Sequence, residues 1–402
     1  MNFSGLLRRC FRQVLGWSAS PQLSGVWARI WLASHGRWRR SRHDLDLASV
    51  RRLAVIRYDG LGDLVVTTAF LRELRRSAPA ARITLIVRPE WVGLMTAFPH
   101  VDEVLGFATV VYPRFTVQRQ LWDLAKFCRK ELWPRRFEAA LVPQECFPIF
   151  DARLMALLSG APERVGRRQA TGQGVPSPGR LLSRVDLGLP KGHEVDALRA
   201  WLIELGGRPQ DTRLELTWGS GVDEVLDKSL GRRLLEGPLW VALGIGASQE
   251  EKRWPTARFI ELGRRFQVLG MRLILVGGND LVEEGRAISA ALGATTLDMT
   301  GKLQLDGTAA LLARCDIFVG NDSGPMHIAA AVGAPVVEVV GWPADVPPEL
   351  PGTPLRIGPY CRHRRIVQPA GWGGPYDIRI KEVSVEQVWD AVVSLLAETG
   401  KG

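Results

Sequence analysis

The stretch that decides the fold is Phe318-Val-Gly-Asn-Asp322-Ser323-Gly324-Pro325-Met-His327-Ile-Ala-Ala-Ala-Val-Gly333-Ala-Pro335. It predicts a buried strand over Cys315–Val319, a sharp turn through Asn-Asp-Ser-Gly, and a helix of small residues over Pro325–Val332. A second strand is expected over Val336–Val340. A strand that enters a helix in this way is typical of a parallel α/β sheet.

The turn of this stretch has the residues that a helix start requires. Ser323 or Asp322 suits the N-cap, and Pro325 in the first turn costs no hydrogen bond because the first N–H groups of a helix are unpaired. Gly333 and Pro335 are expected to end the helix. Several free backbone N–H groups would then point out of the carboxyl edge of the sheet, which suits a diphosphate. An ordinary βα turn is the alternative interpretation.

The first half of the chain alternates apolar strands with amphipathic helices. The expected strands are Leu53–Arg57, Ile83–Val87, Glu103–Phe107 and Ala139–Val142. The expected helices are Leu64–Ser77, Gln118–Lys130 and His193–Leu205. Between them, Ala170–Pro178 is rich in Gly, Ser and Pro and is interpreted as a surface loop. This alternation predicts a doubly wound parallel sheet.

The second half restarts the same alternation without a visible sequence repeat. The expected strands before the opening stretch are Trp240–Ile245, Leu273–Val276 and Thr295–Met299. The expected helices are Thr256–Val268, Leu281–Leu292, Gly307–Ala313 and Val385–Ala397. The segment Trp342–Tyr376, rich in Pro, Gly and Trp, is interpreted as a loop.

Together the two halves predict an α/β protein of two Rossmann-like, doubly wound domains that face a central cleft. We expect a basic N-terminal arm over 1–50, the first domain over 51–208, the second over 209–380, and a C-terminal helix and tail over 381–402. Ligands bind outside the carboxyl ends of such strands. The glycine-bearing turns Gly60–Asp63, Gly244–Lys252, Gly277–Asn279 and Asn321–His327 should therefore open toward the cleft.

Composition is that of a soluble globular protein, with 46% hydrophobic and 23% charged residues over 402 residues. No uninterrupted apolar run approaches the ~18 residues that span a bilayer. Arginines interrupt the apolar residues near the N-terminus, so a signal peptide is not indicated. The five cysteines are far apart and form no Cys-x-x-Cys pair. They predict neither a zinc site nor a disulfide framework, but reduced thiols in a cytosolic protein.

The net charge of +10 is concentrated near the N-terminus, where eight arginines and no acidic residue precede Asp44. In a helix, Leu7, Cys10, Phe11 and Val14 would share one face. A basic amphipathic segment with tryptophans suits the surface of an anionic membrane. A helix packed on the protein's own core and a disordered basic tail are the alternatives. Nucleic acid is the weaker candidate because no nucleic-acid-binding signature follows.

Three loop residues have chemistry that suits the cleft. Asp63 follows the first strand, where a carboxylate can cap the next helix or act as a general base. Lys252 follows the strand Trp240–Ile245 and could hold a diphosphate as it leaves, although a solvated charge cluster with Glu250 and Glu251 is an equal alternative. His327 could contact a phosphate or be a core histidine.

Several other chemistries find little support in the sequence. Asp44-Leu-Asp46 lies in the linker before the first strand, so no metal site is predicted. No His-Glu-x-x-His, Gly-x-Ser-x-Gly or Gly-x-x-x-x-Gly-Lys-Ser/Thr motif occurs. The first βα turn contains Gly-x-Gly but lacks the third glycine of a dinucleotide site. We expect no cofactor.

Three motifs together give the chain a family resemblance. They are Arg57-Tyr-Asp-Gly-Leu-Gly62-Asp63, Gly246-Ala-Ser-Gln-Glu-Glu-Lys252-Arg-Trp254-Pro255 and Gly320-Asn-Asp322-Ser323-Gly324-Pro-Met-His327. With His193-Glu194-Val-Asp196, they resemble glycosyltransferase family 9, the ADP-heptose:lipopolysaccharide heptosyltransferases and their relatives. The resemblance covers roughly 50–397 in order and spacing, which is far more specific than any single motif.

The resemblance implies a GT-B architecture with an N-terminal acceptor domain and a C-terminal nucleotide-sugar domain. It implies inverting, metal-independent transfer of a heptose from ADP-heptose to a lipid-linked acceptor of the lipopolysaccharide core. Asp63 would be the general base, and Lys252 would neutralise the leaving diphosphate. The donor and its diphosphate would be bound by Ser248, Asp322, Ser323, Gly324 and His327. Acceptor-side positions would be Arg57, Gly62 and Gln144.

Three departures from the family pattern stand out. The basic arm precedes the point where the family usually begins. After Val340, Gly341-Trp342-Pro343-Ala-Asp345 replaces the frequent Gly-Pro-Thr-Asp-Pro, which bears on the nucleotide and donor sugar. Gln144 matches a frequent glutamine, but Glu145 stands where a glycine commonly follows.

The preferred hypothesis is a heptosyltransferase acting at the cytoplasmic face of the inner membrane, as a peripheral protein. Its partners would be a nucleotide sugar, a lipid-linked oligosaccharide and the anionic membrane surface, without nucleic acid. The alternatives are a family 9 enzyme with another nucleotide sugar or surface-glycan acceptor, a two-domain NDP-sugar epimerase, and a non-catalytic membrane-associated module.

Overall fold

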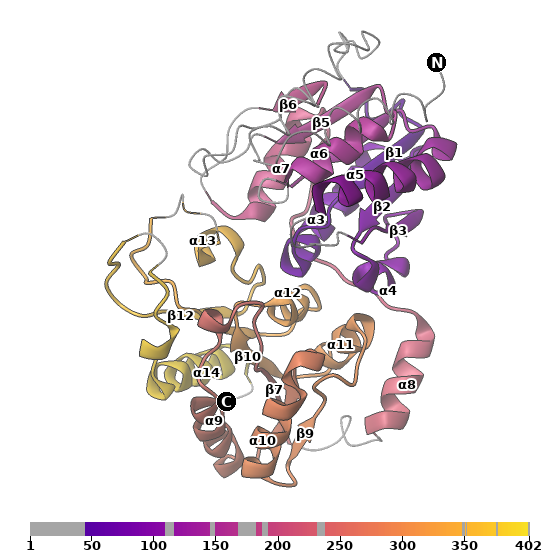
Figure 1. Cartoon of the computed structure of the whole chain (residues 1–402). Coiled ribbons are helices and arrows are strands. Elements are labelled where there is room, and N and C mark those ends of the chain that lie inside the picture. Colours follow the sequence, from indigo (N-terminus) through magenta and orange to yellow (C-terminus); the bar gives the residue numbers. More distant parts are fainter. Residues whose placement is uncertain are drawn as a thin grey trace.

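The computed structural model describes residues 45–108, 116–144, 149–167, 182–186, 192–230, 238–347, 350, 352–374 and 377–400. These residues form two α/β lobes, one above the other in Figure 1. The arm over 1–44 and the predicted loop Ala170–Pro178 lie outside the described residues. Element labels follow Figure 1.

The upper lobe is built on a six-stranded parallel sheet with the order β3-β2-β1-β4-β5-β6. Its strands are β1 (Arg52–Ile56), β2 (Arg82–Val87), β3 (Glu103–Gly106), β4 (Ala139–Val142), β5 (Glu163–Arg167) and β6 (Arg184–Asp186). Its α-helices are α3 (Leu61–Ser77), α4 (Val92–Thr96), α5 (Thr116–Phe127), α6 (Ile149–Leu158) and α7 (Glu194–Glu204). The helix α8 (Ser220–Leu230) follows them on the way to the lower lobe.

The lower lobe is built on a second six-stranded parallel sheet, β12-β11-β10-β7-β8-β9. Its strands are β7 (Trp240–Gly244), β8 (Arg272–Val276), β9 (Thr296–Asp298), β10 (Ile317–Asn321), β11 (Val336–Val339) and β12 (Arg364–Val367). Its α-helices are α9 (Thr256–Val268), α10 (Val282–Leu292), α11 (Leu305–Leu312), α12 (Gly324–Ala331), α13 (Pro354–Ile357) and α14 (Val385–Thr399).

Both sheets have one topology although their sequences show no repeat. Counted from its own first strand, each has the order 3-2-1-4-5-6 of a doubly wound dinucleotide-type fold. The strand order reverses between β1 and β4 in the upper sheet, and between β7 and β10 in the lower one. Ligands bind at such switch points. The predicted fold class is therefore confirmed.

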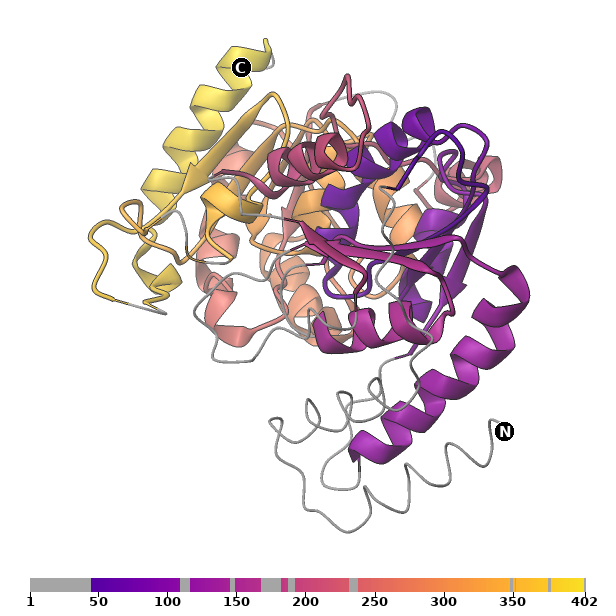
Figure 2. The ribbon, with the colours of Figure 1, turned by 90° about the horizontal axis from the view of Figure 1, so that it is seen from above.

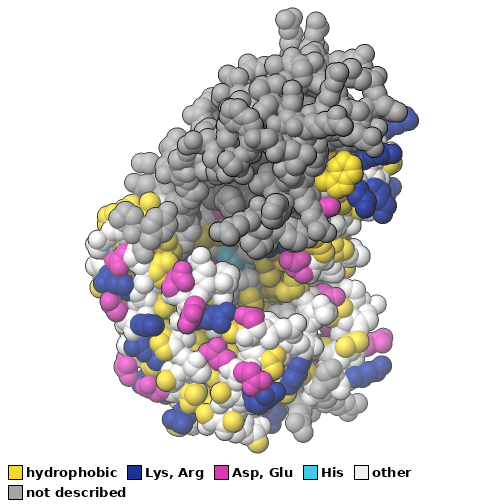
Figure 3. All heavy atoms as spheres, viewed as in Figure 1, with side chains coloured by type: hydrophobic (Ala, Val, Ile, Leu, Met, Phe, Trp, Pro, Cys, Tyr) yellow, Lys and Arg dark blue, Asp and Glu magenta, His cyan; other side chains and the backbone are white. Residues whose placement is uncertain are grey.

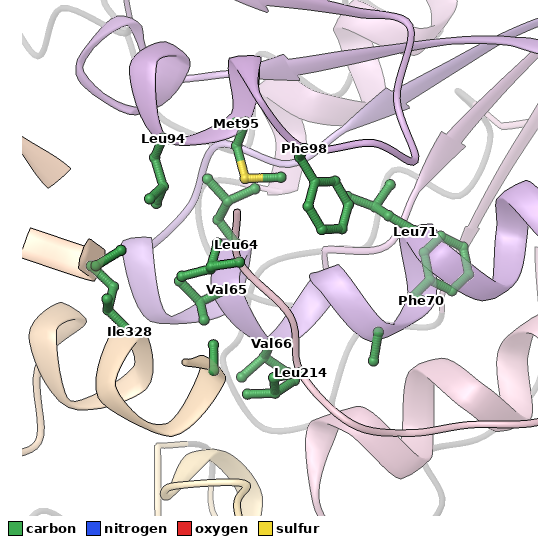
Figure 4. Packing of buried hydrophobic residues seen from close by; sticks show 14 of the residues in the cluster. Leu64, Val65, Val66, Phe70, Leu71, Leu94, Met95, Phe98, Leu214 and Ile328 are labelled. Carbon is green, nitrogen blue, oxygen red and sulfur yellow. The ribbon is translucent and has the colours of Figure 1, made fainter. Parts of the chain in front are cut away.

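The strands are buried on both faces, as parallel strands covered by helices must be. In β1, Leu53 and Val55 face the lobe interface, whereas Ala54 and Ile56 pack beneath α5 and α6. One apolar cluster continues from the upper sheet through α3 and α12 to the lower sheet. Figure 4 shows Leu64 and Leu94 of the upper lobe close to Ile328 of α12. The two lobes thus share a core at the seam.

Local sequence signals explain several element boundaries. Ser384 caps α14 through a reciprocal capping box with Gln387, and His193 Nδ1 accepts a hydrogen bond from the N–H of Val195 at the start of α7. Gly333 has a φ of 83° and follows α12, as predicted. The helix over Thr256–Val268 has the predicted bounds.

Two predictions about the secondary structure of the lower lobe were wrong. The segment Trp342–Tyr376 is not only loop, because it contains α13 and the edge strand β12. The Pro and Gly residues of this segment favoured the loop interpretation, although it contains the short basic strand β12, which pairs only with β11. The strand predicted at Cys315–Val319 lies two residues later, at Ile317–Asn321, so that Asn321 belongs to the sheet and not to the turn.

Candidate functional site

Asp63 lies in the first turn of α3, just beyond the carboxyl end of β1. The helix was expected to begin at Leu64, but it begins at Leu61 with Gly60 at the N-cap. Asp63 is therefore inside the helix and does not cap it. A Cβ at residue 60 would lie 2.6 Å from Asp63 Oδ2, so glycine leaves the room that this carboxylate occupies. The side chain of Asp63 remains 36% exposed and accessible to a substrate.

A buried guanidinium holds Asp63 and two further carboxylates together. Arg57 is only 1% exposed, and its Nη2 lies 3.1 Å from Asp63 Oδ1 and 3.6 Å from Glu194 Oε1. Its Nε lies 3.1 Å from Asp59 Oδ1. Glu194 also accepts a hydrogen bond of 2.6 Å from Arg167 Nη1. Residues that follow β1 thus meet residues of α3, β5 and α7 in one ion network.

This network sets the protonation of Asp63. Burial raises the pKa of Asp63 to about 7, with further contributions from the negative charges of Asp59, Glu194 and Asp322, while Arg57 opposes the rise. Burial also raises the pKa of Asp59. The pKa of Glu194 is instead lowered, because Arg167 and Arg57 outweigh its burial. Asp63 is the carboxylate poised to exchange a proton near neutrality.

The lower lobe presents a cation at its own switch point. Lys252 follows β7, and its Nζ donates a hydrogen bond of 2.8 Å to Asp322 Oδ2, which follows β10. Asn321 ties the two loops together: its Oδ1 accepts from the N–H of Trp254, and its Nδ2 donates to the carbonyl of Ile245. This bracing fixes the backbone on both sides of the pair.

Carboxylates outnumber cations around Lys252 as well. Burial alone would lower the pKa of Lys252, but the negative charge of Asp322 outweighs burial and raises it. Lys252 is therefore charged at neutral pH. Glu338 on β11 is buried within the influence of both groups, and burial followed by the charge of Asp322 raises its pKa well above the ordinary value. A neutral Glu338 does not compete with Asp322 for the ion pair with Lys252.

The start of α12 offers fewer free amides than the sequence suggested. Ser323 occupies the N-cap, but its hydroxyl donates to the carbonyl of Asn321 instead of capping the helix. The N–H groups of Met326 and His327 donate to the carbonyl of Ser323. Pro325 has none, so Gly324 carries the one first-turn amide of α12 without a partner in the described structure. An anion here would depend mainly on Lys252.

The N-termini of α3 and α12 meet across the seam. A Cβ on Gly62 would lie 2.4 Å from Cδ2 of His327, and one on Gly324 would lie 2.5 Å from Cδ2 of Leu61. The two glycines therefore permit an interlocked approach of the lobes. His327 is enclosed there, and burial lowers its pKa to about 4. It is neutral at physiological pH and adds no positive charge.

The interlock brings the two clusters to one place. Asp322 lies close enough to Asp63 to help raise its pKa, although the two residues belong to different lobes. Figure 3 shows the surface hollowed between the lobes, with a histidine side chain visible deep inside. Because Asp322 is also the partner of Lys252, the ion pair of the lower lobe lies within electrostatic reach of Asp63 in the upper lobe.

The remaining predicted positions differ in their access to this gap. Ser248 is exposed in the loop before Lys252 and makes no hydrogen bond within the described residues. Gln144 follows β4 at the upper switch point, but its side chain is fully buried. Arg57 is likewise buried and contacts carboxylates. An acceptor would thus meet Asp63 more readily than these two side chains.

Three residues of the site were not among the predicted site residues. Glu194 was noticed only as part of a motif, yet it anchors Arg57. Asn321 looked like a turn residue, and Glu338 was an isolated acid in a strand of valines. An acidic residue inside a buried strand was the available signal for Glu338, since such a residue is rarely placed there without a function.

A second bridge links the lobes beside the site. His193 Nε2 lies 2.9 Å from the carbonyl of Gly358, and the hydroxyl of Tyr360 lies 3.2 Å from Asp196 Oδ1 and Thr212 Oγ1. The ring centroids of His193 and Tyr360 are 4.7 Å apart. The start of α7 is thereby joined to the segment between α13 and β12.

The described residues contain no group of three or more His, Cys, Asp or Glu side chains arranged to hold a metal ion. Within the same part of the chain, no helix combines the length and apolarity needed to cross a bilayer. The described cysteines, Cys128, Cys315 and Cys361, are free thiols.

Two Rossmann-like domains whose switch points face each other across a cleft define the GT-B class of glycosyltransferases. Solved structures share this fold along nearly the whole chain. Glycosyltransferase family 9 from Veillonella parvula matches with a TM-score of 0.72 and 24% identity, covering 89% of this chain and all of that one (100%). E. coli ADP-heptose lipopolysaccharide heptosyltransferase II matches with a TM-score of 0.67 and 23% identity, covering 87% and 99%.

Sequence comparison gives similarities to the same family. The model of glycosyltransferase family 9 (heptosyltransferase) matches residues 221–346. Lipopolysaccharide heptosyltransferase 2 of Salmonella typhimurium is 24% identical over 380 residues, covering 87% of this chain and 99% of the relative. The Escherichia coli K12 protein of the same name is 27% identical over 309 residues, covering 72% and 82%. The chain is therefore similar to the heptosyltransferases of glycosyltransferase family 9 over most of its length.

Proposed function

We propose that this enzyme transfers a heptose from ADP-heptose to an acceptor in the lipopolysaccharide core, with inversion and without a metal ion. The observation that carries the proposal is the opposition of Asp63, whose pKa is about 7, to the Lys252–Asp322 pair across the seam. These groups lie at the two switch points, where a GT-B enzyme must bring acceptor and donor together.

Asp63 acts as the general base. Its carboxylate removes the proton of the acceptor hydroxyl as the oxygen attacks the anomeric carbon of the donor sugar. A base with a pKa near the working pH is efficient because a large fraction is deprotonated while its basicity remains high. Arg57 holds this carboxylate from the buried side, and the 36% of Asp63 that is exposed is available to the acceptor.

Lys252 stabilises the leaving group on the opposite side. Negative charge grows on the diphosphate as the glycosidic bond breaks, and a fixed ammonium beside it lowers the barrier. The N–H of Gly324 is the further donor at this point. A single displacement of this kind inverts the anomeric configuration. The positive charge of Lys252 performs the task that a divalent cation performs elsewhere, so the proposed reaction uses no metal.

The donor and acceptor are inferred from the relatives. Several are named lipopolysaccharide heptosyltransferases, and one solved structure is named for ADP-heptose. Since identities are near 24%, the sugar, the nucleotide and the acceptor position are the parts of the proposal that most need testing. We place the reaction at the cytoplasmic face of the inner membrane, with the protein bound peripherally and a lipid-linked oligosaccharide as acceptor.

The test uses the purified full chain with ADP-heptose and a heptose-deficient lipopolysaccharide. The expected result is ADP release that requires the acceptor, a mass gain of one heptose on the acceptor, and an inverted anomeric linkage by NMR. Activity that is unchanged by a chelator is expected. UDP- and GDP-sugars serve as control donors, and no transfer from them is expected.

Each competing function gives a different result. Acceptor-dependent release of UDP or GDP, and not ADP, would replace the donor but keep the family. Isomerisation of the nucleotide sugar without any acceptor would identify an epimerase. Binding of the donor without turnover would leave a binding module. Mass spectrometry of the core oligosaccharide from cells lacking this protein would identify both the missing sugar and its attachment site.

A further inference from the structure

The helix α5 and its continuation present a stripe of tryptophan and cationic residues on the upper lobe. The helix runs on through a π-helical turn, Cys128–Leu132, and a short 3-10 turn, Trp133–Arg135. Its inner face is buried, with Leu124, Cys128 and Leu132 packed into the core under the sheet. The direction of the opposite face is therefore fixed by packing, and its two tryptophans are partly exposed.

The outward face repeats with the period of a helix. Its exposed members, called here the α5 stripe, are Trp122, Lys126, Arg129, Lys130 and Trp133. Their spacing of four, three, one and three residues keeps them on one side of the helix. The tryptophans stand at the two ends, 49% and 39% exposed, with the three cations between them. Figure 3 shows Lys and Arg side chains gathered beside a hydrophobic one on the rim of the upper lobe.

Local acidic residues do not neutralise the stripe. Asp123 and Glu131 are half-buried beside it, and Glu131 is shared between Lys130, at 3.2 Å, and Arg135, at 3.4 Å. The Trp133 indole has a fixed direction because its Nε1 donates to the carbonyl of Leu158. The stripe thus carries a net positive charge between two large aromatic side chains.

We infer that the α5 stripe docks the enzyme on an anionic membrane surface. Tryptophans favour the headgroup level of a bilayer, where the apolar ring and the polar N–H are both satisfied. Cations near an anionic leaflet are attracted by its negative potential. A helix that combines both on one face, while its other face is anchored in a core, suits binding in the plane of the interface.

The α5 stripe lies on the upper lobe. The helix α5 follows β3 in the chain, and the segment after it returns to the start of β4. The last part of the stripe lies near the amino edge of the sheet, because Arg135 pairs with Glu103 at the start of β3. A membrane bound along the stripe would therefore lie beside the lobe that carries Asp63. The inference rests on the proposed lipid-linked acceptor for its purpose, but its test does not involve that acceptor.

The test is flotation of the full chain with vesicles of phosphatidylcholine alone or with added phosphatidylglycerol. The chain is expected to bind the anionic vesicles and to be released by salt. In Lys126→Glu/Arg129→Glu/Lys130→Glu the vesicle partition constant should fall at least about 100-fold, because three attractive charges become repulsive. Trp122→Ser should lower it several-fold.

Matched controls lie on the lower lobe and near the interlobe segment. Lys228→Glu/Arg264→Glu/Lys381→Glu makes the same change in net charge at exposed positions, and Val268→Ser removes an apolar side chain that is 85% exposed. Both controls should bind as the unchanged protein does. Transfer to a deacylated, soluble acceptor should be equal in all variants, which separates loss of docking from loss of the proposed reaction.

Three results would overturn the inference. The stripe variants could float as well as the unchanged protein, which would assign membrane binding to another segment such as the basic arm. The control triple variant could lose binding equally, which would reduce the effect to net charge. Binding to RNA or heparin without binding to anionic vesicles would assign the stripe to a different polyanion.

Discussion

The two lobes hold their charged groups in different ways. In the upper lobe, one buried guanidinium, Arg57, serves three carboxylates and is fixed from several elements. In the lower lobe, the ammonium of Lys252 is 23% exposed and has one close partner, Asp322. A guanidinium that pairs with several carboxylates holds them in fixed positions. An ammonium with a single partner can exchange that partner for a ligand. The upper cluster is therefore suited to tuning a proton acceptor, and the lower one to receiving a diphosphate.

The largest expected effect comes from breaking the upper cluster at its exposed member. Asp63→Asn removes the proposed base but keeps its shape, so turnover should fall by about 10²–10⁴-fold. Binding of ADP, measured by calorimetry, should change little because Asp63 belongs to the other lobe. Asp63→Ala should behave in the same way. Near-normal turnover in either variant would contradict the assignment of the base.

The next effect comes from breaking the lower cluster. Lys252→Met should lower turnover by about 10²–10³-fold, because the leaving diphosphate loses its fixed positive charge. Unlike Asp63→Asn, it should also weaken donor binding. Arg253→Met is the matched control, since Arg253 pairs with Asp280 instead of Asp322. Equal damage in both variants would show that the pair with Asp322 has no special role.

A smaller effect should appear in the pH dependence. A base with a pKa of about 7 gives a rate that falls as the pH drops below 7, because Asp63 becomes protonated. Arg57→Lys should move this acid-side fall of the pH–rate profile to higher pH. A lysine ammonium cannot replace the guanidinium that pairs with three carboxylates. An upward move of one unit lowers the acid-side rate about tenfold.

The pH–rate profile has a simple control in Arg51→Lys, an exposed arginine near the start of the same strand. In that variant the rate should fall at the same pH as in the unchanged protein. If the acid-side fall of Arg57→Lys also stays in place, Arg57 does not set the pKa of Asp63, and the contrast between the lobes loses its electrostatic basis.

The contact between the lobes can be tested with a matched pair of glycines. Gly62→Ala should lower the melting temperature and turnover, because its Cβ would lie 2.4 Å from the buried ring of His327. Gly93→Ala lies in α4 with nothing within 4 Å, and it should be neutral or slightly stabilising, by less than about 1 kcal/mol. Equal melting temperatures would show that the interlock is loose.

The smallest expected effect concerns stability. The pKa of Asp63 is about 7 in the folded protein and 3.8 for an ordinary Asp, so the folded state binds more protons between these values. Stability therefore decreases as the pH rises from about 4 to 7. In differential scanning calorimetry at pH 8, Asp63→Asn should melt at a higher temperature than the unchanged protein. The difference between the two proteins should be smaller at pH 5. A lower melting temperature at pH 8 would contradict the cost of burying this charge.

Periodicity and turn chemistry predicted the alternation of strands and helices well. Thr256–Val268 has the expected bounds because Pro255 defines its start. The strand β12 was missed because Arg364 and Arg365 make up half of it, which leaves only Ile366 and Val367 as an apolar signal. As an edge strand it needs only one pairing partner and one buried face.

The site was predictable where backbone geometry decides it. Asp63, Lys252 and Asp322 were chosen as candidates because each follows a strand, and ligands bind at the carboxyl edge of a parallel sheet. Glu194 was not, because α7 is far away in sequence and its contact with Arg57 depends on the packing of α7 against α3. The free amides of α12 were overestimated because the hydrogen bonds to the Ser323 carbonyl depend on the exact turn geometry.

The sharing of Arg57 among three acids bears on how the enzyme resets between rounds of reaction. If Asp63 takes up a proton in the proposed reaction, Arg57 loses one anionic neighbour but keeps Asp59 and Glu194, so its position does not depend on the protonation of Asp63. The site can therefore cycle between charged and neutral forms of Asp63 without moving its scaffold. Each new acceptor then meets the same geometry as the last.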